Sequence, residues 1–87
     1  MARSDRKFKT SFNTWLDSVS IGNSPDTISG LARLLVVSRT LARRVLERAI
    51  EINLISSNSF PIVLLRQPQK SDYFSISEIR SLEERLE

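Results

Sequence analysis

The sequence predicts a mainly α-helical fold with one small β-hairpin. Two observations support this prediction. First, the segment 27–55 contains two apolar stripes with helical spacing, separated by a short break at 36–38. Second, the segment 54–66 holds two short apolar runs on either side of a Ser/Asn-rich turn. Because about three or four residues join the two predicted helices, the segment 27–55 follows the helix-turn-helix plan.

The N-terminal region predicts a basic arm followed by a first helix. Residues 1–7 are polar and basic, so we expect a loose arm there that could add phosphate contacts. The helix is expected over 7–20. Helical spacing favours a core role for its apolar residues over a base-stacking surface. These residues are Phe8, Phe12, Trp15, Leu16 and Val19.

The second and third helices each begin after a residue that can cap a free backbone N–H. Thr27 precedes a helix predicted over 28–35, and Ser38 precedes one predicted over 39–52. The apolar stripes that should face the core consist of Ile28, Leu31, Ala32 and Leu35 in the first of these helices, and of Ala42, Val45, Leu46, Ala49 and Ile50 in the second.

The remainder of the chain predicts a hairpin, a linker and a last helix. Strands are expected at 54–56 and 62–66, and the helix at 76–86, where Ser75 and Glu78 match a capping box. We therefore divide the chain into a domain over 1–66, a linker over 67–74 and a C-terminal helix over 75–87. That helix either packs on the core, or forms a dimer contact, or begins an effector domain missing from this chain.

The composition excludes several classes of function. The 87 residues include no Cys and no His, so disulfides, thiolate or imidazole catalysis and the usual transition-metal sites are excluded. No phosphate-binding glycine loop or converging carboxylate pair is evident. We therefore expect no enzyme activity, no catalytic residue, no cofactor and no metal. No apolar run is long enough for a membrane span, and we expect a cytoplasmic protein.

The charge is distributed unevenly along the chain. Residues 1–71 carry eleven Lys/Arg against five Asp/Glu, a balance of +6, whereas residues 72–87 carry two against five, a balance of −3. The basic body favours a polyanionic partner.

Four polar residues follow Ser38 on the first turns of the third predicted helix: Arg39, Thr40, Arg43 and Arg44. Arg39 and Arg43 are i, i+4 neighbours, so their like charges repel by a few tenths of a kcal/mol in an isolated helix. Positive charge in a first helical turn also opposes the helix dipole. A phosphate or a guanine edge would offset both penalties, and this placement therefore indicates an anionic partner.

The segment 31–55 resembles the winged helix-turn-helix domain of GntR-type bacterial transcription regulators. The similar residues are Leu31-Ala32, Val37-Ser38-Arg39-Thr40, Arg43, Leu46 and Asn53-Leu54-Ile55. The resemblance implies a three-helix core plus a wing, with the C-terminal helix added. It also implies that Arg39, Thr40 and Arg43 contact DNA from the recognition helix 39–52.

Three positions and one segment depart from the family pattern. Ser29 stands where a basic residue is usual, and Val36 stands at a turn position usually held by Gly. A β-branched residue tolerates a left-handed conformation badly, so that turn is either strained or rearranged. Asn53 replaces the glycine that ends the recognition helix, which is a mild change. The wing segment 56–61 has no Gly-x-Gly and no basic residue.

These observations lead to one main functional prediction and one alternative. The main prediction is sequence-specific binding of double-stranded DNA as part of a bacterial transcription regulator, with helix 39–52 in the major groove. Ser38, Arg44 and the N-terminal arm would contact phosphates, and the protein would bind a palindromic site as a homodimer. The alternative is a winged-helix module that docks proteins and does not bind DNA.

Overall fold

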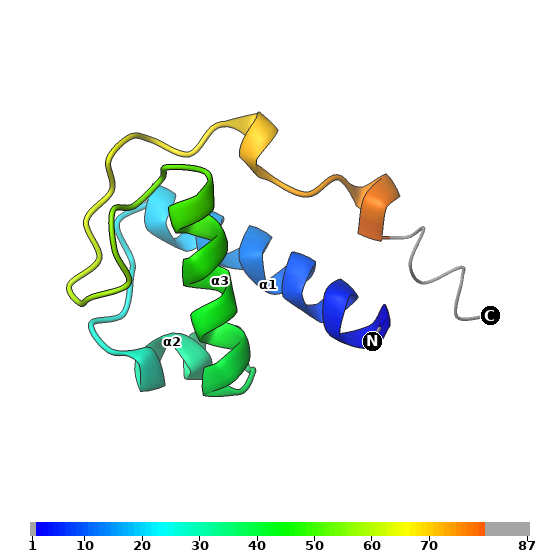
Figure 1. Ribbon diagram of the computed structural model, residues 1–87, viewed down its shortest axis with the longest axis horizontal. Coiled ribbons are helices and arrows are strands. Elements are labelled where there is room, and N and C mark those ends of the chain that lie inside the picture. The colour runs from blue at the N-terminus through cyan, green and yellow to red at the C-terminus, as the bar shows by residue number, and fades with distance from the viewer. Residues whose placement is uncertain (1, 80–87) are drawn as a thin grey trace.

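The structure is a computed structural model that describes residues 2–79, with side chains from Arg6 onward. Its elements in chain order are α1 (Ala2–Ser20), α2 (Ile28–Leu35), α3 (Arg39–Glu51) and a 3-10 turn, η1 (Lys70–Asp72). Figure 1 shows α3 crossing α1, with α2 packed beside the start of α3. The prediction of a mainly α-helical protein is therefore confirmed.

The first helix is longer than expected. Because α1 begins at Ala2, the prediction of a loose arm at the N-terminus is wrong from that residue onward. The polarity of this segment does not prevent a helix, because Ala, Arg and Lys are all good helix formers. The predicted apolar face is buried as expected: Phe12, Trp15 and Leu16 are completely inaccessible to solvent, and Phe8 is partly buried.

Both predicted caps of the helix-turn-helix are present. The Thr27 hydroxyl accepts a hydrogen bond from the Gly30 N–H at 3.0 Å, and α2 has the predicted bounds. The Ser38 hydroxyl accepts from the Leu41 N–H at 3.1 Å, and α3 ends one residue earlier than predicted. The turn between the helices is therefore fixed at both ends by short polar side chains.

The three main helices end in the same way, with a residue at positive φ. These residues are Gly22 (φ 72°), Val36 (φ 57°) and Asn53 (φ 59°). At each end the N–H of the following residue donates a hydrogen bond to the carbonyl five residues earlier, as the Val37 N–H does to the Ala32 carbonyl at 2.9 Å. This is the Schellman arrangement. Val36 is the strained member of the three, because a β-branched side chain is disfavoured at positive φ.

One hydrophobic core joins the three helices to the segment that follows α3. The stripes predicted for α2 and α3 supply most of it, with Ile28 and Ile50 at its margin. Leu54 and Ile55 complete the core beyond the end of α3. The largest fully enclosed side chains are Phe12, Trp15, Leu16, Leu31, Val45, Leu46, Leu54 and Ile55.

The predicted hairpin is not formed as two strands. Within residues 2–79 its two runs meet only at an isolated antiparallel bridge between Ile55 and Leu64, extended by a bond from the Leu65 N–H to the Leu54 carbonyl at 2.8 Å. The connection lacks the Asn-Gly or Asp-Gly pair that closes tight hairpins, and Pro61 removes one possible ladder donor. Ile62 and Leu64 instead pack against the helical core.

The segment predicted as a linker, 67–74, packs on the helical body through Tyr73 and Phe74. Asn13 binds the backbone of Phe74 twice: its Nδ2 donates to the carbonyl at 2.8 Å, and its Oδ1 accepts from the N–H at 2.9 Å. The Phe74 ring packs edge-on against Phe12, with centroids 5.6 Å apart. The Tyr73 hydroxyl donates to Asp17 Oδ1 at 2.7 Å. We refer to residues 67–75 as the strap.

Arg66, directly before the strap, joins Asp72 of the strap to the end of α3. Arg66 donates to both carboxylate oxygens of Asp72, at 2.8 and 3.0 Å, and to the Ile52 carbonyl at 2.9 Å. The hydrogen bonds from Arg66, with a further one from the Gln69 N–H, hold the pKa of Asp72 below its ordinary value. The same pairing raises the pKa of Arg66.

The described part of the C-terminal helix begins as predicted. Residues 76–79 are helical, and the Ser75 hydroxyl accepts from the Glu78 N–H at 3.1 Å, which is one half of the predicted capping box. The predicted continuation over 80–87, with its proposed role in dimerisation, lies outside the described residues.

Replacing Val36 with glycine should stabilise the protein. Val36 is 78% exposed, so Val36→Gly sacrifices little burial while relieving the left-handed strain. We expect a gain of about 1 kcal/mol in the free energy of unfolding, or roughly 5 °C in Tm, measured by thermal denaturation. Val36→Ala keeps a Cβ at positive φ and should gain less. An equal or larger gain in Val36→Ala would attribute the effect to the loss of an exposed apolar group.

The Arg66–Asp72 pair should make stability depend on acid. The pKa of Asp72 is lower in the folded protein than in the unfolded chain. The contribution of the pair to the free energy of unfolding is therefore present above the unfolded pKa of about 3.9. It is lost as the pH falls through the lower folded pKa. Asp72→Asn should lower Tm near neutral pH and converge with the wild type near about pH 2. Asp26→Asn, in the exposed loop before α2, should leave the neutral-pH Tm unchanged. Parallel melting curves of wild type and Asp72→Asn across this range would contradict the expectation.

Candidate nucleic-acid interface

The predicted contact residues begin at the cap of α3. Ser38 is exposed, and its oxygen already accepts the hydrogen bond from Leu41. Its hydroxyl proton remains free to donate outward, because the cap uses only a lone pair. Ser38 therefore has a definite structural role, and a role in phosphate binding is compatible with it.

Arg39, Thr40 and Arg43 lie on the first turns of α3 and are all exposed. Arg39 and Arg43 are four residues apart, so their side chains leave the helix from the same face. Among residues 6–79, neither guanidinium has an ion pair or a hydrogen bond to another side chain. No acidic residue occurs in the first turn of α3. This face therefore offers two available cations next to a positive helix end.

Arg44 is oriented differently from these three residues. Its guanidinium carbon lies over the ring of Phe8 on α1, 4.9 Å from the ring centroid. A guanidinium in this position is attracted by the ring face and covers an aromatic side chain. Arg44 was predicted to contact a phosphate, but the structure separates it from the Arg39/Arg43 face and brings it to α1.

Arg48 continues this second face of α3. Its guanidinium lies over the Phe74 ring, 5.2 Å from the centroid, and its Nε is buried. Arg48 therefore has a structural role, in which it covers an aromatic ring of the strap. The arginines of α3 thus divide into an outward pair and a pair that packs on aromatic rings.

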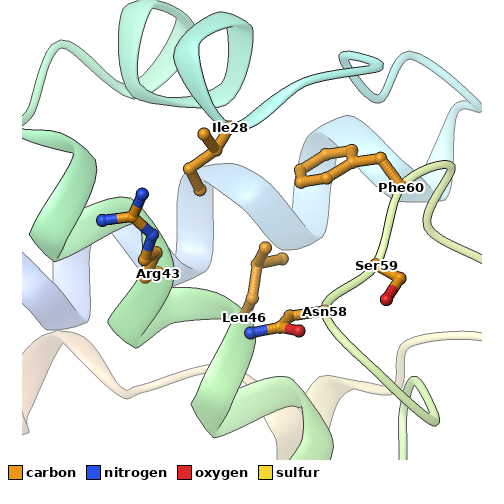
Figure 2. A pocket seen from close by; sticks show the side chains of 6 residues that line it. All are labelled: Ile28, Arg43, Leu46, Asn58, Ser59 and Phe60. Atoms are coloured by element: carbon orange, nitrogen blue, oxygen red, sulfur yellow. The ribbon is translucent and has the colours of Figure 1, made fainter.

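An open groove lies beside the outward pair. It has a volume of about 430 Å³ and lies between the start of α2, the middle of α3 and the loop 56–60. Figure 2 shows Arg43 at one side of the groove, with Leu46 and Asn58 below the gap that separates Ile28 from Phe60. The groove is therefore continuous with the face that carries Arg43. Its lining residues are Ile28, Arg43, Leu46, Asn58, Ser59 and Phe60.

Sequence reasoning identified Arg43 but did not identify this groove. Phe60 gave a weak signal, because a large apolar residue in a polar Ser/Asn loop must either be exposed or find a surface to cover. It is partly buried and packs against the core. Nothing in the local pattern indicated that this would bring Asn58 and Ser59 opposite α3, since that placement depends on the path of the whole segment after α3.

Three comparisons with known proteins were negative: no family model, no curated protein and no solved structure matches this chain. Among the helices of residues 2–79, none combines the length and apolar character needed to cross a membrane.

The capping role of Ser38 gives a stability prediction. Ser38→Ala removes the acceptor for the Leu41 N–H and should cost about 1 kcal/mol of stability, measured by chemical denaturation. Ser38→Asp keeps an acceptor and adds a negative charge at the helix N-terminus, so its stability should equal or exceed that of the wild type. If Ser38→Asp were as unstable as Ser38→Ala, the hydroxyl would have a role other than capping.

Proposed function

We propose that the protein binds double-stranded DNA sequence-specifically as part of a bacterial transcription regulator, with α3 in the major groove. The observation that supports this most directly is the exposed Arg39/Arg43 pair on the first turns of a capped helix. A guanidinium can bond two acceptors on a guanine edge, worth roughly 1–3 kcal/mol of discrimination. The resemblance to GntR-type regulators supports the same reading.

In this proposal the residues of α3 have different tasks. Base edges are contacted by Arg39, Thr40 and Arg43, which either read the sequence or position the helix. Ser38 donates a hydrogen bond to a phosphate. Arg44 covers the ring of Phe8 and so supports the packing of α3 on α1. The segment 54–66 takes the place of a wing in a winged helix-turn-helix, although its loop has no basic side chain. A homodimer in the cytoplasm, bound to a palindromic site, completes the proposal.

The second candidate is a module that docks another protein. One observation favours it: Val36 is 78% exposed and Leu34 is 39% exposed, so two exposed apolar side chains lie at the end of α2, at the turn between α2 and α3. Apolar residues at a surface are common in protein contacts. Against it, a protein-docking surface does not require two unpaired arginines on the adjoining helix.

Binding of a labelled mixed-sequence duplex, followed by fluorescence anisotropy at several salt concentrations, tests the proposal. Arg39→Ala/Arg43→Ala should weaken binding by about tenfold or more. The plot of the logarithm of the binding constant against the logarithm of the salt concentration should also become less steep, by about one for each phosphate contact that is lost. Lys70→Ala removes a charge from η1, outside the proposed interface, and serves as the control.

Two results would contradict the DNA-binding proposal. In the first, the wild type does not bind the duplex even at low salt. In the second, the double variant and Lys70→Ala bind with the same affinity and the same salt slope as the wild type. Either result would leave the protein-docking candidate as the leading explanation of this surface.

A further inference from the structure

We propose that the groove between α2, α3 and the loop 56–60 binds a small organic carboxylate with an apolar body. The carboxylate would pair with Arg43, and the ligand would thereby compete with DNA. The binding site itself depends only on the groove. The competition rests on the proposed function.

The walls of the groove suit an apolar body. Ile28 and Phe60 form the two upper sides and Leu46 the floor (Figure 2). Ile28 and Phe60 are only partly buried, so each has apolar surface left to cover, whereas Leu46 is almost completely buried in the core. The volume of about 430 Å³ lies within the range of small-molecule sites, about 300–1,000 Å³.

The polar groups of the groove determine the charge of the ligand. Arg43 is the one charged residue in the lining, and no carboxylate faces it there. Asn58 and Ser59 add an amide and a hydroxyl, both able to donate. A guanidinium pairs with a carboxylate through two parallel hydrogen bonds. A single guanidinium beside three apolar walls therefore fits a monoanion with a hydrocarbon part better than a polyphosphate or a cation.

The position of Arg43 connects this site to DNA binding. Its side chain belongs both to the outward face of α3 and to the edge of the groove. A carboxylate bound to the guanidinium would occupy the donors needed for a base edge or a phosphate, and it would cancel the charge. The ligand would therefore lower DNA affinity without any change in the fold.

The probe for this site is 4-phenylbutyrate, with 4-phenylbutanol as the uncharged analogue of the same shape. Titrations of the full chain are followed by ¹⁵N NMR, with shifts expected at the six lining residues. We expect the acid to bind about tenfold more tightly than the alcohol, because a hydrogen-bonded charge adds that much. Arg43→Gln should abolish this preference. Arg39→Gln, on the same helix but outside the lining, should retain it.

Three outcomes would overturn the proposed site. They are no chemical-shift changes up to about 10 mM probe, equal binding of acid and alcohol, or an equal loss of the preference for the acid in Arg43→Gln and Arg39→Gln.

The competition with DNA is tested by repeating the anisotropy titration in the presence of 4-phenylbutyrate, which should raise the apparent Kd for the duplex in the wild type. If the probe binds and DNA affinity does not change, the competition is wrong. If the chain binds no DNA at all, the proposed function fails, and the NMR titration alone decides the ligand site.

Discussion

Burial of the aromatic face of α1 against α3 is the constraint on which the rest of the structure depends. A helix of 13 residues, the length of α3, is marginal in water by itself. Phe12, Trp15 and Leu16 are fully buried in the core that α1 shares with α3, and each such side chain contributes about 1.5–3 kcal/mol. This packing fixes the rotation of α3 about its own axis, and that rotation decides which arginines face outward.

The two sets of arginines follow from this rotation. Once Val45 and Ala49 face the core, Arg44 and Arg48 are carried to the edge of α1 and the strap, where aromatic rings are available. Arg39 and Arg43 remain on the open side, next to the groove. The arginines of α3 therefore have two different roles. Arg44 and Arg48 stabilise the packing of α3, and the Arg39/Arg43 pair remains available to a partner.

Local patterns in the sequence were sufficient for both ends of α2, for α3 to within one residue and for the C-terminal end of α1, but not for its N-terminal end. The stripes of α2 and α3, the caps at Thr27 and Ser38 and the left-handed Asn53 all depend on residues within one or two turns of each other. The strap could not be predicted in this way. Asn13 and Phe74 are 61 residues apart, and no local pattern indicates that they bind each other. For the same reason no local pattern indicated that Arg44, predicted to contact a phosphate, would lie over the ring of Phe8.

The enclosure of Trp15 has a practical consequence. It is the only tryptophan in the chain and has no exposed surface, so the tryptophan emission of the protein comes from a single buried indole between the helices. Its spectrum should be blue-shifted in the native state and should move to the red on unfolding. The proposed interface and the groove lie elsewhere, on the outer surface of α3. Intrinsic fluorescence will therefore report the integrity of the core, and changes at the outer surface of α3 will have to be followed with an added label.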